Sequence, residues 1–101
     1  MNISRVEALI LEQLTAAAGV ELYGLQMVKA SNEALKMGTI YVSLGRLQEK
    51  GFVTSRREAD PAQTVPRRLY KITGLGQRTF LAWQAGMEAY NRKFGFTGAA
   101  A

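Results

Sequence analysis

Arginine side chains concentrate in one part of this chain. Residues 46–71 contain five arginines and two lysines, against two glutamates and one aspartate. A guanidinium group can bind a phosphate, or the edge of guanine, through two parallel hydrogen bonds. The whole chain carries a net charge of +5 and has a pI near 9.9, which fits either simple solubility or an anionic partner such as nucleic acid or a membrane surface. Because the positive charge is concentrated, we favour the anionic partner.

The chain has few residues suited to catalysis or metal binding. The 101-residue chain has no cysteine and no histidine, which removes thiolate zinc sites, cysteine nucleophiles and the usual general base. The acidic residues are scattered singly. No apolar segment reaches the length of about 18 residues that a spanning helix needs, and the N-terminus lacks the pattern of a secretory leader. We therefore expect one cytoplasmic domain that is not an enzyme and holds no metal or cofactor.

The segment TIYVSLGRLQEKGFV, residues 39–53, must position part of this chemistry. Ile40, Leu44 and Leu47 recur at helical spacing, so the segment is predicted to be a helix with one buried face. The opposite face carries Val42, Gly45, Arg46 and Glu49, with Tyr41 and Ser43 on its two shoulders. Glycine on a water-facing helix costs about 1 kcal/mol relative to alanine. The face is therefore either a poorly optimised solvent surface or, as we favour, a contact surface.

Capping residues and turn-forming residues locate the remaining helices and strands. Ser4 and Glu7 form a capping box that predicts a helix from Ser4 to a stop at Gly19. A second helix is expected from about Tyr23 to Glu33, and a turn over residues 35–38 precedes the helix described above. Residues 52–57 and 68–72 are predicted to form a hairpin around the loop EADPAQTVP. Thr73 is expected to cap a last helix that runs to about Phe94, and the predicted core consists of Ile40, Leu44, Leu47, Leu25, Val28, Tyr70 and Ile72.

This order of elements is that of a winged helix-turn-helix. The predicted fold class is α+β, mainly α with a small β-hairpin, followed by one C-terminal helix. In such a fold the third helix enters the DNA major groove, and the hairpin wing grips the flanking backbone or minor groove. The domain would span residues 1–73, the C-terminal helix residues 74–95, and a flexible tail residues 96–101. The alternative is a winged-helix module that binds protein through the same apolar surface.

Three stretches resemble one known family. Tyr23-Gly24, then GTIYVSLGRLQEKGFVTSRRE from Gly38, then PRRLYKIT followed by Gly76, are together similar to the PadR-like transcriptional regulators over about residues 5–92. The resemblance implies a dimeric winged-helix repressor of a bacterial or phage genome, in a short form that dimerises through one C-terminal helix. Two positions depart from the family pattern: Lys36-Met37 replace its usual Ser-Pro, and Val42 stands where proline is usual.

Double-stranded DNA is therefore the expected partner. Thr39 either caps its own helix or contacts phosphate, and Arg46 either reads guanine or neutralises phosphate. The ring of Tyr41 is expected to pack on the second helix while its hydroxyl reaches DNA. About half of the four hairpin arginines should touch DNA, since strand alternation sends neighbours to opposite faces. The expected DNA-contacting residues are Tyr23, Thr39, Tyr41, Val42, Ser43, Gly45, Arg46, Arg56, Arg57, Arg67 and Arg68.

The last helix carries an aromatic stripe. Its members have the 3, 4, 3, 4 spacing of a heptad seam; they are Phe80, Trp83, Met87, Tyr90 and Phe94. The stripe either folds back on its own domain or, as we favour, meets a partner chain in a homodimer, with Val6 and Ile10 of the first helix as the second surface. Trp83 could also stack on a small aromatic effector, although packing in the interface is the simpler interpretation.

Overall fold

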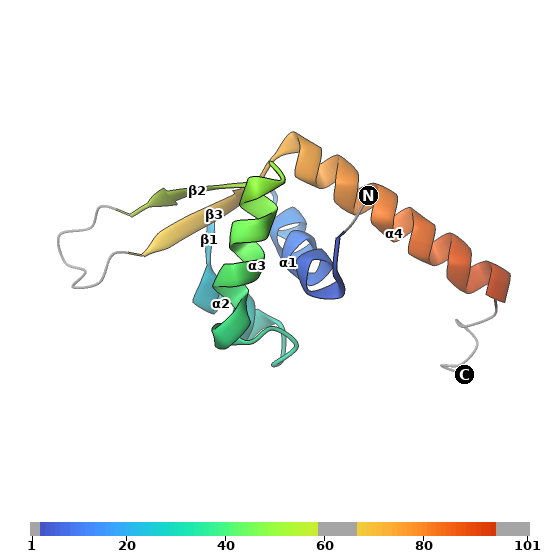
Figure 1. Ribbon diagram of the computed structural model, residues 1–101, viewed down its shortest axis with the longest axis horizontal. Helices are drawn as coiled ribbons and strands as arrows, with labels where there is room; N and C mark the ends of the chain where they lie inside the picture. Colours follow the sequence, from blue (N-terminus) through green and yellow to red (C-terminus); the bar gives the residue numbers. More distant parts are fainter. Residues whose placement is uncertain (1–2, 59–66, 95–101) are drawn as a thin grey trace.

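The computed structural model describes residues 3–58 and 67–94. In these ranges it contains α1 (Arg5–Ala16), β1 (Leu22–Tyr23), α2 (Gly24–Ala30), α3 (Met37–Glu49), β2 (Val53–Arg57), β3 (Arg68–Ile72) and α4 (Gly74–Phe94). The predicted α+β class and order of elements are confirmed, and the sequence analysis missed only the short strand β1 (Figure 1). Residues 59–66 of the predicted hairpin loop and the predicted flexible tail at 96–101 lie outside the described residues.

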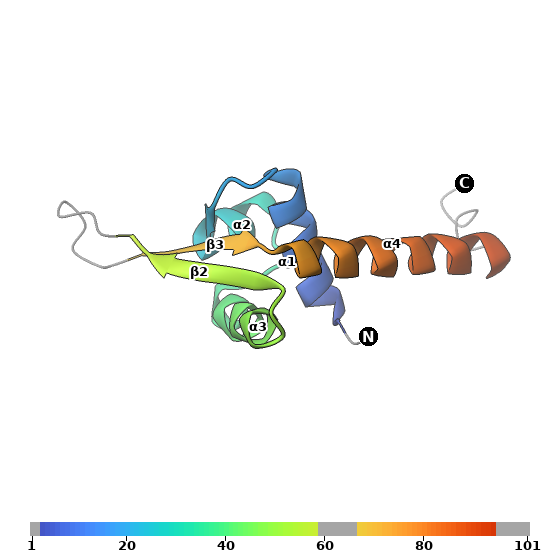
Figure 2. The same cartoon turned by 90° about the horizontal axis from the view of Figure 1, so that it is seen from above.

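The elements form one body from which α4 projects. The sheet lies over α1, α2 and α3, and α3 occupies the side nearest the viewer in Figure 1. The first part of α4 packs on α1, while its C-terminal part extends away from the body, opposite to the ends of β2 and β3 (Figure 2). The fold therefore presents two separate features, α3 beside the hairpin and a long exposed helix.

The sheet is antiparallel, with strand order β1-β3-β2. β1 contributes only the pairs Leu22 with Tyr70 and Tyr23 with Leu69. Strand β2 pairs with β3 from Val53–Ile72 to Arg57–Arg68. Because directly opposed residues share a face and neighbours along a strand alternate, this register decides which side of the sheet each hairpin arginine occupies.

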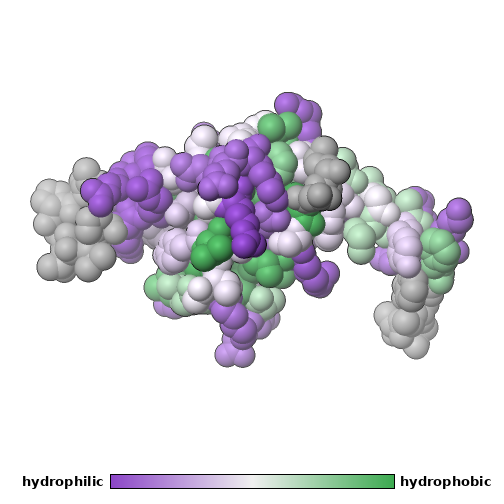
Figure 3. Space-filling view, viewed as in Figure 1, coloured by the Kyte–Doolittle hydropathy of each residue, from purple (hydrophilic) through white to green (hydrophobic). Residues whose placement is uncertain are grey.

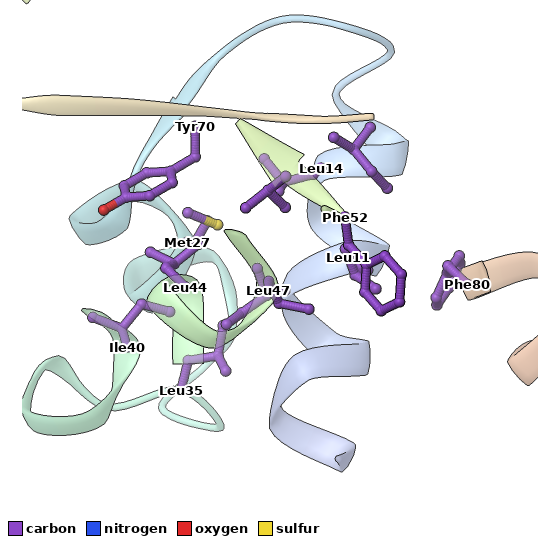
Figure 4. Close-up of a cluster of buried hydrophobic side chains, with 13 residues drawn as sticks. Leu11, Leu14, Met27, Leu35, Ile40, Leu44, Leu47, Phe52, Tyr70 and Phe80 are labelled. Carbon is purple, nitrogen blue, oxygen red and sulfur yellow. The ribbon is translucent and has the colours of Figure 1, made fainter. Parts of the chain in front are cut away.

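The core lies between the helices and the inner face of the sheet (Figure 4). Ile40, Leu44 and Leu47 are fully buried, as predicted. The buried state of Tyr70 and Ile72 is also confirmed. The prediction that Leu25 belongs to the core is wrong, because its side chain is 45% exposed. In the short helix α2 the buried side chain is that of Met27, with Val28 partly buried beside it.

The hydrogen bonds at the helix ends can be compared with the predicted capping residues. The Ser4 side chain accepts a hydrogen bond from the Glu7 backbone at 3.1 Å, and the Glu7 side chain accepts one from Ser4 N at 2.7 Å, so the capping box is confirmed. The Thr73 cap is confirmed by the bond from Gly76 N to Thr73 Oγ1 at 3.0 Å. Helix α2 ends at Ala30, earlier than predicted, because Asn32 and Glu33 adopt positive φ.

Helix α3 begins at Met37, before the predicted start at Thr39, and no side-chain hydrogen bond caps it at Lys36. Its other end is held by an ion pair. Lys50, the C-cap of α3, lies 2.8 Å from the carboxylate of Glu7, which is nearly fully buried. Burial alone would raise the pKa of Glu7, but hydrogen bonds from Lys50 and Ser4 outweigh it and hold the pKa below its ordinary value. The ionised pair therefore fixes α3 against the start of α1.

Candidate nucleic-acid interface

The exposed face of α3 has the composition that the sequence predicted. Val42 is 57% exposed and Tyr41 48% exposed, although both are apolar or largely apolar side chains. A Cβ placed on Gly45 would meet no atom within 4 Å, so the helix backbone is uncovered there. The exposed Arg46 makes no ion pair or side-chain hydrogen bond with the described residues. Figure 3 shows hydrophobic and hydrophilic residues side by side on this front surface.

Ser43 does not belong to that face. Its side chain is only 7% exposed. Position 43 lies three residues after Ile40 and four before Leu47, so it continues the buried stripe, where a short hydroxyl side chain fits. The predicted place of Ser43 on the exposed face is therefore wrong, whereas its contact with DNA stays a prediction.

Two polar side chains near the start of α3 have local partners. The Thr39 hydroxyl donates to the Lys36 carbonyl at 3.4 Å and remains exposed. The Tyr41 ring packs on the first residue of α2, since a Cβ on Gly24 would lie 2.9 Å from ring carbons and 2.8 Å from the hydroxyl oxygen. The expected packing of Tyr41 on α2 is confirmed. Glycine at position 24 is what lets α2 and α3 approach so closely.

One pair of hairpin arginines lies on the side of the sheet that faces the helices. Arg57 and Arg68 are directly opposed, two residues beyond the pair Ser55 and Tyr70 on the same face. Tyr70 points from β3 toward Met27 in the core (Figure 4). Within the described residues, neither Arg57 nor Arg68 has an acidic partner. Two like charges therefore stand on directly opposed residues, without a described acidic group to compensate them.

The other pair lies on the opposite side and is neutralised. The Arg56 side chain makes a forked ion pair with Glu21, with Nε–Oε2 and Nη2–Oε1 both at 2.8 Å. These hydrogen bonds lower the pKa of Glu21 and raise that of Arg56, so both groups stay charged. Arg67 lies 3.6 Å from Glu58. Among the residues that the structure describes, Arg57 and Arg68 are thus the two hairpin arginines without an acidic partner.

A chain of hydrogen bonds that sequence reasoning missed links α3 to the hairpin. Arg68 Nη1 donates to Ser55 Oγ at 3.0 Å, and Ser55 Oγ donates to Gln48 Oε1 at 2.9 Å. Gln48 follows the buried Leu47 near the end of α3. Residues 48, 55 and 68 carry no sequence pattern that relates them, because only the strand register brings them together. The chain holds the Arg68 guanidinium beside α3.

The aromatic stripe of α4 divides into two parts. Phe80 is only 3% exposed and packs in the core near Phe52, so its assignment to a dimer interface is wrong (Figure 4). Trp83 stacks on Phe80 with ring centroids 6.3 Å apart and is half-buried. Beyond this point α4 leaves the body, and Met87, Tyr90 and Phe94 are 41%, 49% and 58% exposed.

The first helix contributes less to that surface than expected. Ile10 is completely buried inside its own chain, so its assignment to a dimer interface is also wrong. Val6 is partly buried against the core. Between α1 and α4 runs an open groove of about 240 Å³. It is lined by Arg5, Ala8, Leu9, Glu12, Trp83, Met87 and Asn91.

A comparison with protein families identifies a family that matches this chain. The model of the transcriptional regulator PadR-like family matches residues 10–82, from the middle of α1 to the first part of α4. The chain belongs to the PadR-like family. The resemblance drawn from the sequence is thus confirmed, and the family is one of transcriptional regulators, not of enzymes.

Solved structures of PadR-like proteins share the fold. A PadR family regulator from Clostridium difficile R20291 has a TM-score of 0.73 and 22% identity, covering 90% of this chain and 98% of that chain. One from Eggerthella lenta has a TM-score of 0.75 and 23% identity, with coverages of 90% and 79%. Bacillus subtilis PadR, solved in complex with operator DNA, has a TM-score of 0.71 and 23% identity over 80% of this chain and 47% of its own.

Other comparisons are negative. No curated protein sequence matches the chain. Within residues 3–58 and 67–94, no helix is long and apolar enough to cross a membrane. The same part of the chain holds no group of acidic side chains that could bind a metal ion.

Proposed function

We propose that this PadR-like protein is a homodimeric, sequence-specific DNA-binding regulator that acts as a repressor. The observation that carries the proposal is the exposed face of α3, which combines Val42, Gly45 and Arg46. Arg57 and Arg68, which have no acidic partner among the described residues, lie on the side of the sheet that faces the helices. Helix α3 lies in the major groove, and the hairpin rests on the flanking backbone or minor groove. A symmetric dimer places its two α3 helices about one DNA turn apart, so the operator is an inverted repeat.

The face of α3 suits a major groove. Val42 supplies an apolar group that can meet a thymine methyl, and Gly45 lets the backbone approach closely. Arg46 supplies donors for guanine or for phosphate. Thr39 and Tyr41 are exposed nearby and can donate to phosphate oxygens.

The arrangement of the hairpin arginines also favours an anionic partner. Like charges directly opposed on neighbouring strands destabilise a sheet, and Arg57 and Arg68 hold that arrangement without a described acidic partner. A phosphate between or beside them would remove the repulsion and gain charge-assisted hydrogen bonds. We therefore assign phosphate contacts to Arg57 and Arg68 and a structural role to Arg56.

The experiment that tests this function is a gel shift of the purified protein on the DNA upstream of its own gene, with random DNA of equal length as competitor. We expect a shift at low salt that upstream DNA competes away better than random DNA. The second candidate function, a winged-helix module that binds protein through the apolar α3 surface, rests on the exposure of Val42. No shift on any DNA at low salt would favour that module.

The two faces of the hairpin should differ in their effect on DNA affinity. Arg68→Ala should weaken binding to all sequences about equally and reduce the slope of log affinity against log salt by about 1, since one phosphate contact is lost. Arg56→Ala removes the same charge from the opposite face and should leave that slope nearly unchanged. Fluorescence anisotropy titrations at several salt concentrations measure both slopes. Equal slopes for the two variants would contradict the assignment of the faces.

Dimerisation is assigned to the projecting part of α4. Met87, Tyr90 and Phe94 leave a large apolar surface exposed on a helix that extends beyond its own domain. A small domain gains stability when a second copy covers such a surface. The groove between α1 and α4 is the surface proposed for the partner's helix, with Val6 nearby. Trp83 lines that groove, and we assign it to packing in the interface in preference to an effector site.

Tyr90→Ala should therefore weaken the dimer by about 10-fold or more, because it removes a large aromatic side chain from the interface. Leu81→Ala is the matched control, since Leu81 is 55% exposed on the same helix but lies outside the aromatic stripe. Sedimentation equilibrium over a range of micromolar concentrations measures both dissociation constants. A folded wild-type protein that remains monomeric throughout that range would contradict the proposed dimer.

A further inference from the structure

Three polar side chains meet where the hairpin leaves the body of the domain. Tyr23 ends β1 and is also the N-cap of α2. Glu58 directly follows β2 and Arg67 directly precedes β3, and the Glu58 N–H donates to the Arg67 carbonyl at 2.8 Å. The cluster therefore joins the outermost described backbone contact of the hairpin to the start of the helix-turn-helix.

Each member of this cluster contacts the other two. The Tyr23 hydroxyl donates a 2.7 Å hydrogen bond to Glu58 Oε2. The Arg67 guanidinium lies over the Tyr23 ring, with Cζ 4.3 Å from the ring centroid, within the range of a cation–π contact. The Arg67 Nε atom is 3.6 Å from the same Glu58 oxygen. The carboxylate thus receives a neutral donor and a cation, and the aromatic ring supports the cation.

The register places this cluster on the face of the sheet that turns away from the core. Tyr23 is paired with Leu69, whereas Tyr70, the next residue, points into the core. Arg67 lies two residues before Leu69, on the same face by strand alternation. Arg57 and Arg68 occupy the other face. The cluster therefore stands behind the arginines that we assign to phosphate.

The cluster is poorly placed to stabilise the fold as a whole. The Glu58 and Arg67 side chains are 27% and 44% exposed, and ion pairs at such exposure contribute little to global stability. What the contacts do restrict is the orientation of the outer hairpin relative to α2, because Tyr23 belongs to the body and both of its partners belong to the hairpin. Fixing that orientation before DNA binds would avoid part of the ordering cost of association.

We propose that Tyr23, Glu58 and Arg67 form a latch that sets the angle of the hairpin to the helix-turn-helix, so that Tyr23 is a positioning residue for DNA binding and does not itself contact DNA. This deepens the proposed function and rests on it for the effect on DNA. The fraying of the hairpin, by contrast, can be measured without DNA.

The test uses the Tyr23→Phe variant, which keeps the ring under Arg67 and removes only the hydroxyl. In the DNA-free protein, hydrogen exchange followed by NMR should show the Glu58 amide exchanging at least about threefold faster, since the outermost hydrogen bond opens more often. Amides of β2 and β3 beside the pair Val53 and Ile72, at the opposite end of the hairpin, should exchange at the wild-type rate. Affinity for the upstream DNA should fall by about fivefold, on the scale of the net contribution of one ordinary, partly exposed hydrogen bond.

Glu58→Gln tests the latch because the latch predicts a loss of DNA affinity where the removal of a negative charge predicts a gain. Removing a negative charge near DNA by itself raises affinity, and Glu88→Gln, on the exposed surface of α4, serves as the control for that general effect. If Glu58 belongs to the latch, the Glu58→Gln variant should bind the upstream DNA more weakly than the Glu88→Gln variant does. Combining Glu58→Gln with Tyr23→Phe should cost less than the sum of the two single losses.

Wild-type exchange at Glu58 in Tyr23→Phe would overturn the latch, whatever the DNA results. Reduced DNA affinity together with wild-type exchange would instead make Tyr23 a direct DNA contact. Failure of the wild-type protein to bind any DNA would overturn the proposed function alone, because the exchange measurement would still decide whether the latch exists.

Discussion

Replacing Gly76 by alanine should destabilise the protein by about 3 kcal/mol or more, at the upper end of what overpacking costs. A Cβ at this position in the first turn of α4 would lie 2.1 Å from the Phe52 carbonyl oxygen, 3.0 Å from its carbonyl carbon and 2.8 Å from Ile72 Cγ1. Two of these atoms belong to the backbone, which cannot turn aside as the end of a flexible side chain can. Either α4 or the chain entering β2 must therefore shift.

The surrounding hydrogen bonds prevent a cheap adjustment. The Thr73 N–H donates to the same Phe52 carbonyl at 3.0 Å, and the Thr73 hydroxyl donates to the Gly51 carbonyl at 2.7 Å while accepting from Gly76 N. Moving α4 away would break the cap of the helix and its link to the start of β2. Buried backbone groups left without partners add about 1–3 kcal/mol each.

Urea unfolding followed by circular dichroism measures this loss. Gly45→Ala is the matched control, since the same methyl group at Gly45 meets nothing within 4 Å in the interior of α3. That substitution should stabilise the fold by up to about 1 kcal/mol through helix propensity. Similar unfolding midpoints for the two variants would show that the backbone at Phe52 yields more readily than its hydrogen bonds suggest.

Gly76 also shows where sequence reasoning ends. Gly76 fits the family pattern, but nothing in the local sequence shows that the carbonyl of Phe52, 24 positions earlier in the chain, lies against it. The capping residues Ser4, Glu7 and Thr73 could be predicted because each acts within one helical turn. Local patterns therefore predict the ends of helices, whereas close contacts between elements require the fold.

In the candidate interface, too, local patterns predicted some features and the fold determined others. Helical periodicity was sufficient to separate the buried Ile40, Leu44 and Leu47 from the exposed Val42. Ser43 was placed wrongly because its polarity suggested exposure, whereas its position continues the buried stripe. Similarly, the stripe of α4 could be read from the sequence, but its spacing does not say that the chain's own core covers Phe80.

The hairpin arginines show most clearly what could not be predicted from the sequence. Strand alternation predicted that they divide between two faces, yet the sequence could not say which pair keeps an uncompensated charge. Arg56 finds its partner Glu21 35 residues away, through a short strand, β1, that contains only Leu22 and Tyr23. A strand of that length has too few residues to show a periodic pattern, and its existence depends on pairing with β3.

Val42→Glu should greatly weaken specific DNA binding while the protein stays folded, if α3 enters the major groove as we propose. The side chain is 57% exposed, so the fold can accept a carboxylate there without burying it. In the complex, that carboxylate would lie against base edges or phosphates, where like-charge contacts cost several kcal/mol. We expect affinity for the upstream DNA to fall by about 100-fold or more, corresponding to about 2.7 kcal/mol. Anisotropy titration measures the affinity, and circular dichroism and sedimentation check the fold and assembly.

The matched control for this change is Val20→Glu. Val20 is 64% exposed, between α1 and β1, so the substitution alters the net charge equally at a site remote in the sequence from α3. General electrostatic weakening should then appear in both variants, at the modest level that one exposed charge produces in salt, and only the excess loss in Val42→Glu reports contact with DNA. If folded, dimeric Val42→Glu binds as tightly as Val20→Glu, the exposed face of α3 does not enter the groove. Its apolar and glycine residues would then serve a different partner, as in a protein-binding module.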